Sequence, residues 1–472
     1  MSEEYLSFRA EMMRFCRRFF TILLSGILIL SLTATNTNIP RAKAQPQIPF
    51  REPDWSTPDE VFDLAVSADG SIVAVATSEG LKVYNAIGSL LWSWSQTDFT
   101  VTAVSVSDDG NVVVATRYNG TSGWSHLLFW KNAKTLSGNP QPNWSSEGLG
   151  GRIAEEALDV SSDGNQVVAV GTGPNVFYWN NTLTLSGEEQ PTTWWDYLDY
   201  WLEFVDVSDD GDVIAILGKY ETGKSFYYDA FVYKDCRTRT RYQNGGYNLT
   251  YDFGSSDTCG GIALSNNGQY VVAGVGNRIY FFNMSMTGDW APQWISQRKE
   301  GEWVVAVDIS SDGNVVAAVT NGLFESPGGL VIFQDATSKT GDVSADKNFA
   351  AASQYTEHNY WNVSVDGAGN LAAAGTGDYL FAVNASTGEP LWLYNGTYSK
   401  VSRFVRVSED GYVVVSAGYE IDSLYYFSLA RPPVGGYIVP TDTSAESAIP
   451  LLILVLAAAT TITLAIKKKT ST

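Results

Sequence analysis

Short apolar runs recur along this chain, and a polar turn of one kind separates each pair of runs. The turn has the form V-S-x-D-G, with one apolar run before it and another after it. Clear copies are Val66–Gly70, Val106–Gly110, Val160–Gly164, Val207–Gly211, Ile309–Gly313 and Val407–Gly411, and looser copies are Leu264–Gly268 and Val365–Gly369. Asp-Gly or Asn-Gly between two β-rich runs is a strong hairpin signal, with both central residues expected at positive φ. The pattern therefore predicts a repeated β-hairpin.

The runs that follow the turns predict strands buried on both faces. Ile72–Ala76, Val112–Ala115 and Val167–Val170 are apolar throughout, whereas half-exposed strands alternate apolar and polar residues. A third strand follows, as in Leu81–Tyr84 and Arg278–Phe282. The repeat glycines are 40 to 57 residues apart, which suits one four-stranded propeller blade per repeat.

Eight motifs predict an all-β fold, a β-propeller of about eight four-stranded blades. Seven blades are the alternative, if one motif is displaced. The last repeat ends at the third strand Tyr425–Phe427, while Phe50–Trp55 reads as a fourth strand that lacks its blade. Pairing of these two segments would close the ring and leave no exposed sheet edge.

The fourth strand of the repeat carries a family resemblance. Val383–Trp392 contains a Thr-Gly turn followed by Trp392, and Val83–Trp92 has Gly88 four residues before its Trp; Trp144, Trp194 and Trp294 fit more loosely. This pattern resembles the repeat of PQQ-like (quinoprotein-type) and WD-repeat-like propellers over about residues 50–429. The resemblance implies that each Trp docks on the next blade. Quinoprotein dehydrogenases hold their quinone with calcium, a catalytic Asp and often adjacent disulfide-bonded cysteines. No adjacent cysteines occur here, so no catalytic or cofactor-binding residue is assigned.

The N-terminal segment predicts export. Arg14, Arg17 and Arg18 precede the apolar run Phe19–Leu32, and Ala42–Ala44 is an A-x-A cleavage site. These features predict a signal peptide over residues 1–44, with an uncleaved anchor helix as the alternative.

The C-terminal segment predicts a membrane anchor. Ile449–Ile466 is an 18-residue apolar stretch followed by Lys467–Lys469. We expect a transmembrane helix over residues 448–466 and a cytoplasmic basic tail over 467–472. A stalk containing Pro and Gly (430–447) would join the helix to an extracellular propeller (45–429). The chain is thus expected at the cell surface as a single-pass membrane protein.

Two further features agree with export. Acceptor sequons occur at Asn119, Asn143, Asn180, Asn248, Asn283, Asn384 and Asn395, and an eighth, Asn362, lies inside a predicted strand. Cys16 lies in the signal segment, which leaves Cys236 and Cys259. A lone cysteine pair in an oxidising compartment predicts a disulfide between these two residues.

Charge and composition limit the partners. The formal net charge is −21, with 15 Trp and 13% aromatic residues. An acidic body repels nucleic acid and anionic lipid, so neither is expected to bind the propeller. The membrane is expected to be contacted only through the C-terminal helix.

Catalytic and metal chemistry find little support in the sequence. The only histidines, His126 and His358, lie in different repeats, and no phosphate-binding loop occurs. Asp159-x-Ser161-x-Asp163 begins like a calcium loop, as do the equivalent stretches from Asp206 and Asp308. The twelfth position never supplies the bidentate Glu, so calcium is a minor alternative to a plain hairpin turn.

The favoured function is a non-catalytic binding or scaffold module for an extracellular protein or glycan. The alternative is an extracellular enzyme, either a PQQ-type oxidoreductase or a polysaccharide-active hydrolase. Recognition is expected in connections of unequal length: Lys131–Asn143, Asn180–Thr193, Lys219–Ser256 and Asn321–Asn359. Candidate sugar-stacking or protein-contacting residues are Trp194, Trp195, Tyr197 and Asp199. Arg237, Arg239 and Arg241 form either a basic patch or a solvated loop edge.

Overall fold

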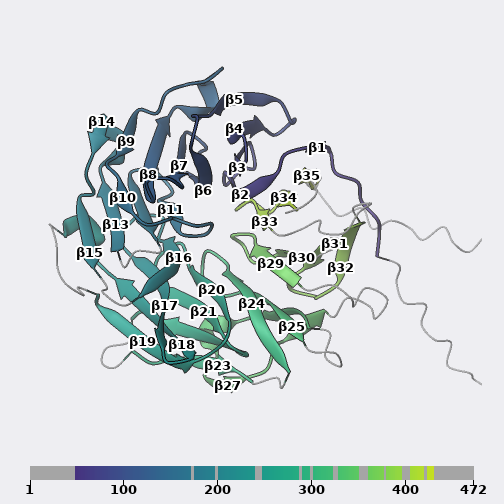
Figure 1. The fold of residues 1–472 in the computed structure, drawn as a ribbon. Coiled ribbons are helices and arrows are strands. Elements are labelled where there is room, and N and C mark those ends of the chain that lie inside the picture. Colours follow the sequence, from purple (N-terminus) through teal and green to yellow (C-terminus); the bar gives the residue numbers. More distant parts are fainter. Residues whose placement is uncertain are drawn as a thin grey trace, which may run out of the picture. The chain divides into compact units, whose positions relative to one another are not determined.

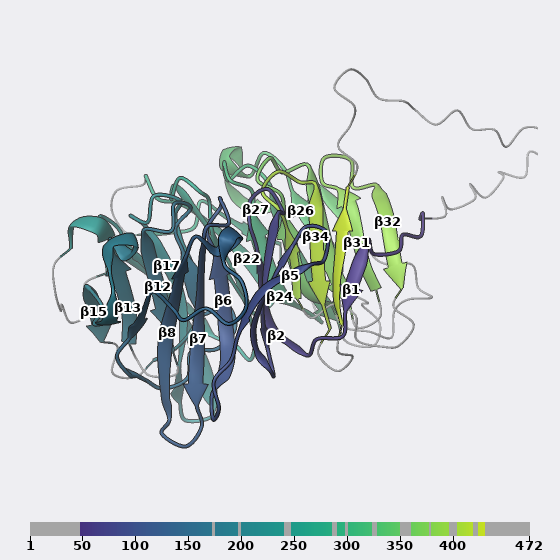
Figure 2. The same cartoon turned by 90° about the horizontal axis from the view of Figure 1, so that it is seen from above.

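The computed structural model describes residues 48–429, except 172–174, 197–199, 240–246, 286–289, 298–300, 323–327, 350–359, 377–378, 396–403 and 419–422. The described strands form eight antiparallel blades that follow one another around a ring (Figure 1). Seen from the side, the strands run across the depth of the ring, and β7 and β8 extend beyond their neighbours at one face (Figure 2). The prediction of an eight-bladed all-β propeller is confirmed.

The first four blades are given from the innermost strand outward. Blade 1 contains β2 (Val61–Val66), β3 (Ile72–Thr77), β4 (Gly80–Asn85) and β5 (Leu90–Trp94). Blade 2 contains β6 (Thr100–Val106), β7 (Val112–Asn119), β8 (Trp124–Lys131) and β9 (Trp144–Ser146), with β10 (Leu149–Gly150) also paired to β8. Blade 3 contains β11 (Leu158–Val160), β12 (Gln166–Val170), β13 (Asn175–Asn180) and β15 (Thr193–Asp196). Blade 4 contains β16 (Trp201–Val207), β17 (Ile214–Thr222), β18 (Ser225–Tyr233) and β19 (Leu249–Ser255).

The last four blades follow the same order. Blade 5 contains β20 (Cys259–Leu264), β21 (Tyr270–Val275), β22 (Arg278–Asn283) and β23 (Trp294–Ser296). Blade 6 contains β24 (Glu302–Ile309), β25 (Val316–Gly322), β26 (Gly329–Phe333) and β28 (Lys347–Phe349). Blade 7 contains β29 (Tyr360–Val365), β30 (Leu371–Thr376), β31 (Tyr379–Asn384) and β32 (Pro390–Asn395). Blade 8 contains β33 (Phe404–Val407), β34 (Val413–Ala417), β35 (Leu424–Ser428) and β1 (Trp55–Thr57).

The connection between the third and fourth strands of a blade also covers the preceding blade. Short 3-10 turns begin several of these connections: η1 (Ala133–Thr135), η2 (Thr182–Thr184), η3 (Cys236–Thr238) and η4 (Ala336–Ser338). After η2, β14 (Gly187–Glu189) adds in parallel to β9 of blade 2, and after η4, β27 (Gly341–Val343) adds in parallel to β23 of blade 5. The outer edges of blades 2 and 5 are thereby paired within the molecule.

The two ends of the propeller sequence close the ring, as predicted. β1 pairs antiparallel with β35, so that Trp55 lies opposite Tyr426. The pairing segment lies a few residues later than the predicted Phe50–Trp55, because Phe50 instead bridges Leu393 on the outer edge of blade 7. The same stretch of chain therefore holds blade 7 and completes blade 8.

The repeated turn has a common hydrogen-bond pattern, seen in Ser161–Gly164. Ser161 Oγ donates to Asp163 Oδ1 (2.9 Å) and accepts the N–H of Gln166, which begins the next strand (3.0 Å). Gly164 has φ of 73°, and a Cβ there would lie 2.4 Å from Val112 Cγ2 of the neighbouring blade. The turn therefore needs Gly for both its backbone conformation and its close packing. The expectation of positive φ at the Asp is wrong: only the Gly adopts it, as in a type I turn followed by a G1 bulge.

A continuous collar of backbone hydrogen bonds joins these turns around the axis. Within this collar, the N–H of the x residue in one V-S-x-D-G turn donates to the carbonyl of the x residue in the next blade, at 2.9–3.1 Å. The x residues are Ala68, Asp108, Ser162, Asp209, Asn266, Ser311, Gly367 and Glu409. Asp410 N–H then donates to the carbonyl of Ala68 (3.1 Å) and closes the circle.

Tryptophans of the fourth strands dock on the next blade, as the repeat pattern implied. The indole N–H of Trp92 donates to the Ala133 carbonyl at 2.8 Å, and that of Trp294 donates to the Ala336 carbonyl at 2.9 Å. Trp294 also stacks on a Phe ring of its own blade and one of the next blade, with centroids 5.1 and 4.9 Å away. These contacts bury large apolar surfaces between blades, where most of the core lies.

The predicted disulfide is wrong, because Cys236 and Cys259 are both free thiols. Cys236 begins η3 beside the V-S-x-D-G turn of blade 4, and its N–H donates to the Asp212 carbonyl. Cys259 begins β20 and lies opposite Val275, at the other end of a blade. A six-residue strand spans roughly 20 Å, whereas a disulfide requires Cα atoms within about 7 Å.

The predicted terminal segments lie outside the described residues. These are the signal peptide (1–44), the stalk (430–447), the transmembrane helix (448–466) and the basic tail (467–472). Among the described residues, none of the helices has the length and apolar character needed to cross a bilayer.

Candidate functional site

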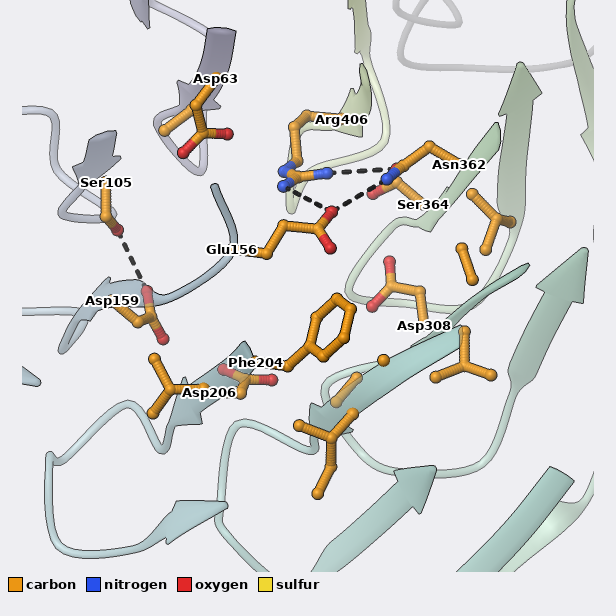
Figure 3. A pocket seen from close by; sticks show the side chains of 18 of the residues that line it. Asp63, Ser105, Glu156, Asp159, Phe204, Asp206, Asp308, Asn362, Ser364 and Arg406 are labelled. Atoms are coloured by element: carbon orange, nitrogen blue, oxygen red, sulfur yellow. Dashed lines mark hydrogen bonds and ion pairs between the residues drawn. The ribbon is translucent and has the colours of Figure 1, made fainter. Parts of the chain in front are cut away.

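The axis of the ring contains a cavity of about 230 Å³ that is lined by all eight innermost strands or the residues beside them. Its polar side chains are Asp63, Ser105, Glu156, Asp159, Asp206, Asp308, Asn362, Ser364 and Arg406, and Phe204 points in among them (Figure 3). Five carboxyl groups and one guanidinium group thus share a small space. We refer to this space as the axial cavity.

One position of the repeat supplies much of this lining. Asp159, Asp206 and Asp308 each lie two residues before the Ser of their turn, and Ser364 and Arg406 occupy the equivalent position in blades 7 and 8. Side chains two residues apart on a strand point to the same side. Because the turn Ser is fixed by its own hydrogen bonds, the repeat directs this position toward the axis.

The carboxylates of the axial cavity join each blade to the next. Asp159 Oδ2 accepts the Val207 N–H at 3.0 Å, which links blade 3 to blade 4. Asp206 Oδ2 accepts the N–H of Leu264 in blade 5 at 2.7 Å.

The same linkage continues further around the ring. Asp308 Oδ2 accepts the N–H of Val365 in blade 7 at 2.7 Å, and Asp63 Oδ2 accepts the N–H of Val104 in blade 2 at 3.0 Å. The acidic side chains therefore have a structural role as clasps between blades, in addition to any role toward a ligand.

A second set of contacts crosses the axial cavity. Glu156 of blade 3 lies 3.5 Å from the Arg406 guanidinium of blade 8 and accepts a hydrogen bond from Asn362 of blade 7 at 3.0 Å. Arg406 also donates to Asn362 Oδ1 at 3.2 Å. Glu156 has φ of 61°, a conformation that residues other than Gly seldom adopt. Figure 3 shows this bridge spanning the cavity.

Side chains of the V-S-x-D-G turns also meet across the axis of the ring. Glu409 of blade 8 accepts a hydrogen bond from Asn266 of blade 5 at 2.8 Å and a short one from Ser311 of blade 6. Gly367 leaves room for this side chain, because a Cβ there would lie 2.3 Å from Glu409 Oε1. Side chains therefore cross the axis in two places, at Glu156 in the axial cavity and at Glu409 among the turns.

Burial perturbs the acid–base properties of the axial cavity. Burial raises the pKa of Asp63 to about 7 and that of Asp308 to about 6. Asp159 and Asp206 share a hydrogen bond, and burial together with the charge of Asp159 raises the pKa of Asp206 well above its usual range. Burial works to lower the pKa of Arg406, but the nearby carboxylates outweigh it and the pKa is raised. The cavity therefore favours a cationic Arg406, and Asp63, with a pKa of about 7, is partly protonated at neutral pH.

The residues of the calcium-loop pattern form a hairpin turn. Asp163 Oδ1 is occupied by Ser161 Oγ and the Asn165 N–H, both at 2.9 Å, while Asp159 faces the axis. Within the described part of the chain, no three His, Cys, Asp or Glu side chains are arranged to hold a metal ion.

Other candidates from the sequence are placed as follows. Tyr197, Asp199 and Arg241 lie outside the described residues, as do the side chains of Trp194 and Trp195. Arg237 lies 3.5 Å from both Asp210 and Asp212, and Arg239 Nε donates to the Lys234 carbonyl at 2.8 Å. The two described arginines are thus held at the edge of blade 4 and do not form a separate basic patch.

The sequons differ in accessibility. Asn143, Asn248 and Asn395 are exposed, and Asn119, Asn180, Asn283 and Asn384 are half-buried. Asn362 is only 6% exposed and belongs to the axial cavity. From the sequence, Asp159, Asp206 and Asp308 were interpreted only as the start of a calcium loop, although their common spacing before the turn was a usable signal that they share a place on the axis.

Comparison with known proteins identifies the fold. The sequence matches no protein-family model and no curated protein. Among solved structures, the crystal structure of the C-terminal WD40 domain of Sif2 aligns with a TM-score of 0.59 and 10% identity, over 81% of this chain and 99% of that one. The chain therefore has a WD40-type β-propeller fold with eight blades.

Proposed function

We propose that this chain is a non-catalytic binding module for a protein or glycan partner, held at a cell surface by its C-terminal segment. The observation that carries the proposal is that the polar groups of the axial cavity are engaged in contacts within the protein. Their oxygens accept backbone N–H groups of neighbouring blades, and Glu156, Arg406 and Asn362 bridge the cavity. When the polar groups on the axis hold the blades together, the faces and the rim of the propeller remain for partners.

Features outside the axis support a surface location. The basic and apolar N-terminal segment and the apolar stretch Ile449–Ile466, followed by lysines, are typical of an exported, anchored chain. Asn143, Asn248 and Asn395 expose sequons that can accept glycans. The WD40-type fold commonly serves as a protein-interaction scaffold, which favours a protein partner over a glycan.

One observation favours the alternative, an enzyme. Asp159 and Asp206 are hydrogen-bonded carboxyl groups with raised pKa values in a cavity, and perturbed carboxyl pairs are common at acid–base sites. Both carboxyl groups also accept backbone N–H groups of the next blade. A structural role therefore accounts for their positions without a catalytic one.

The deciding experiment is a pair of assays on the full chain. Quinone with artificial electron acceptors and a panel of polysaccharides should give no turnover, whereas a surface protein or glycan should bind saturably. Turnover that disappears in Asp206→Asn but persists in the exposed-site control Asp342→Asn would replace the binding function by the enzymatic one.

A further inference from the structure

Blade 5 leaves a cavity at the end of the ring away from the V-S-x-D-G turns. Its second and third strands, β21 and β22, have six residues each, whereas β17 and β18 of blade 4 have nine. Three residues of strand correspond to about 10 Å, so the hairpin of blade 5 ends short of its neighbour. A cavity of about 440 Å³ includes the tip of this short hairpin, and ligand sites commonly have volumes of about 300–1,000 Å³. We refer to it as the blade 5 cavity.

Backbone hydrogen bonds hold the residues around the blade 5 cavity in place. The N–H of Gly276 at the hairpin tip donates to the Thr258 carbonyl at 2.9 Å, and the N–H of Val304 in blade 6 donates to the Gly276 carbonyl at 2.7 Å. Gly276 has φ of 61°, and a Cβ there would lie 3.0 Å from Ser256 Oγ. Because these contacts form without a ligand, binding does not have to order this part of the site.

Three half-buried aromatic rings line the blade 5 cavity, those of Phe253, Tyr280 and Trp303. Phe253 and Tyr280 meet edge-on, with ring centroids 4.8 Å apart. One face of a sugar ring carries C–H groups, which pack favourably against the electron-rich face of an aromatic ring. The cavity therefore offers the kind of apolar wall that a sugar ring can use.

Polar side chains of the same cavity are left without partners by the protein. Within the described part of the chain, Asp257, Asn277 and Arg278 make no side-chain hydrogen bond or ion pair, whereas the carboxylates of the axial cavity accept N–H groups of neighbouring blades. Together these three side chains provide both donors and acceptors. Glu302 also lines the cavity, so charges of both signs are present. Such a lining suits an uncharged ligand with many hydroxyl groups.

A smaller apolar cavity of about 140 Å³ adjoins the first, between blades 5 and 6. Asn277, Glu302 and Trp303 line both cavities. The apolar walls of the smaller one are Ile279, Val304, Val331, Phe333, Val343 and Ala345. Gln297 and Ser344 also line it and are exposed, so a ligand can enter from solvent. Since an apolar cavity of about 150 Å³ can stay dry and take up a small apolar molecule, this space can receive an apolar substituent of a ligand that packs on Trp303.

We propose that the two cavities bind a glycan that contains N-acetylhexosamine. A sugar ring packs on the aromatic wall, its hydroxyl groups bond to Asp257, Asn277 and Arg278, and the methyl of an acetamido group enters the apolar cavity. The WD40-type fold by itself favours a protein partner, but an extended peptide binds most simply at a free strand edge, and β27 occupies the outer edge of blade 5. The inference rests on the proposed function and specifies the glycan partner.

The test compares two tetrasaccharides by isothermal titration calorimetry with the full chain. Tetra-N-acetylchitotetraose and cellotetraose have the same β-1,4-linked backbone, and cellotetraose has a hydroxyl in place of each acetamido group. We expect the acetylated sugar to bind about tenfold more tightly, because one methyl is buried and one amide hydrogen bond is added.

Variants of the chain separate the two cavities. Ala345→Leu fills the apolar cavity and should lower the affinity for the acetylated sugar about tenfold, while cellotetraose stays within about twofold. Ala291→Leu, an exposed site outside both linings, is the matched control and should leave both affinities unchanged. Asn277→Ala, which removes a side chain with no partner in the protein, should weaken both sugars about fivefold. Urea unfolding verifies that each variant is folded.

Each outcome decides the proposal. Tighter binding of the acetylated sugar, with the preference lost in Ala345→Leu and kept in Ala291→Leu, supports it. Equal affinity for the two sugars overturns it, as does a preference that survives in Ala345→Leu. Binding of a leucine-containing peptide that Ala345→Leu abolishes, with neither sugar bound, overturns it in favour of a protein side chain.

The failure of this inference differs from the failure of the proposed function. Absence of sugar binding overturns the glycan site alone, because the binding function fails only through turnover. Cleavage of tetra-N-acetylchitotetraose, detected by chromatography of the incubated sugar, would overturn both.

Discussion

Asp63 allows the electrostatics of the axial cavity to be tested through stability. Its side chain is 3% exposed, and its two oxygens accept the N–H groups of Leu64 at 2.9 Å and Val104 at 3.0 Å. The folded-state pKa of about 7 lies about 3 pH units above the ordinary Asp value of 3.8, and each unit corresponds to about 1.4 kcal/mol. Ionisation of Asp63 in the folded protein therefore costs up to about 4 kcal/mol.

The sign of the pH dependence follows from proton binding. Between pH 4 and 7 the folded state keeps a proton on Asp63 that the unfolded state has released, so stability falls as pH rises through this window and levels off above it. Below pH 4 both states are protonated, and Asp63 contributes no pH dependence.

Asp63→Asn removes this titration while keeping the shape of the side chain. The amide has one accepting oxygen where the carboxyl has two, so one backbone N–H loses its partner at a cost of about 1–3 kcal/mol. We expect the variant to be less stable than the wild type at pH 5. Between pH 5 and pH 8 the relative stability should shift in favour of the variant by about 2–3 kcal/mol.

Urea unfolding of the full chain, followed by tryptophan fluorescence at pH 5, 6, 7 and 8, measures this difference. Asp308 titrates in both proteins, so subtraction isolates Asp63. A difference between variant and wild type that is the same at pH 5 and pH 8 would show that folded Asp63 is already ionised, and the reasoning on burial would then be incorrect.

Three further predictions concern the blades themselves. Trp294→Ala should lower the free energy of unfolding by about 3–5 kcal/mol, because a fully buried ring and its bond to the Ala336 carbonyl are lost; a loss below 1 kcal/mol in urea titration would contradict the docking role. Removal of residues 45–58 takes away β1 and should broaden the urea transition; a truncated protein that unfolds like its parent would refute ring closure. Gly164→Ala should cost about 1–3 kcal/mol more than Gly123→Ala, since both have φ of 73° but only the former meets a neighbouring side chain; equal losses would refute the close packing.

The repeat was predictable because local chemistry determines it. Ser, Asp and Gly at fixed spacing form their turn with hydrogen bonds that stay within six residues, and the apolar runs follow directly. The segment before the first motif also predicted ring closure, since a lone fourth strand has to find the one blade that lacks it. The pairing strand begins at Trp55 and not at Phe50, because Phe50 bridges Leu393 of blade 7, a contact that the sequence pattern does not reveal.

The axial cavity was not predictable as a site, because its contacts join distant repeats. Glu156 and Asn362 are 206 positions apart, and nothing in either local sequence indicates the other. The incorrect disulfide has a related cause. Cys236 and Cys259 are 23 positions apart, but the intervening β19 carries the chain across the blade to the opposite face.

The backbone collar has a consequence for where the chain can begin and end. Every blade donates a backbone hydrogen bond to its successor, through the x residue in blades 1 to 7 and through Asp410 from blade 8 to blade 1. The ring therefore has no first or last member in terms of hydrogen bonding, and the covalent termini are incidental to it. Circularly permuted forms, with old ends linked and new ends opened at the exposed Gly120–Thr121 tip between β7 and β8, should assemble the same eight blades. A variant with one repeat more or fewer would need a different angle between every pair of neighbouring blades. All of the hydrogen bonds of the collar would then have to adjust together for that variant to fold.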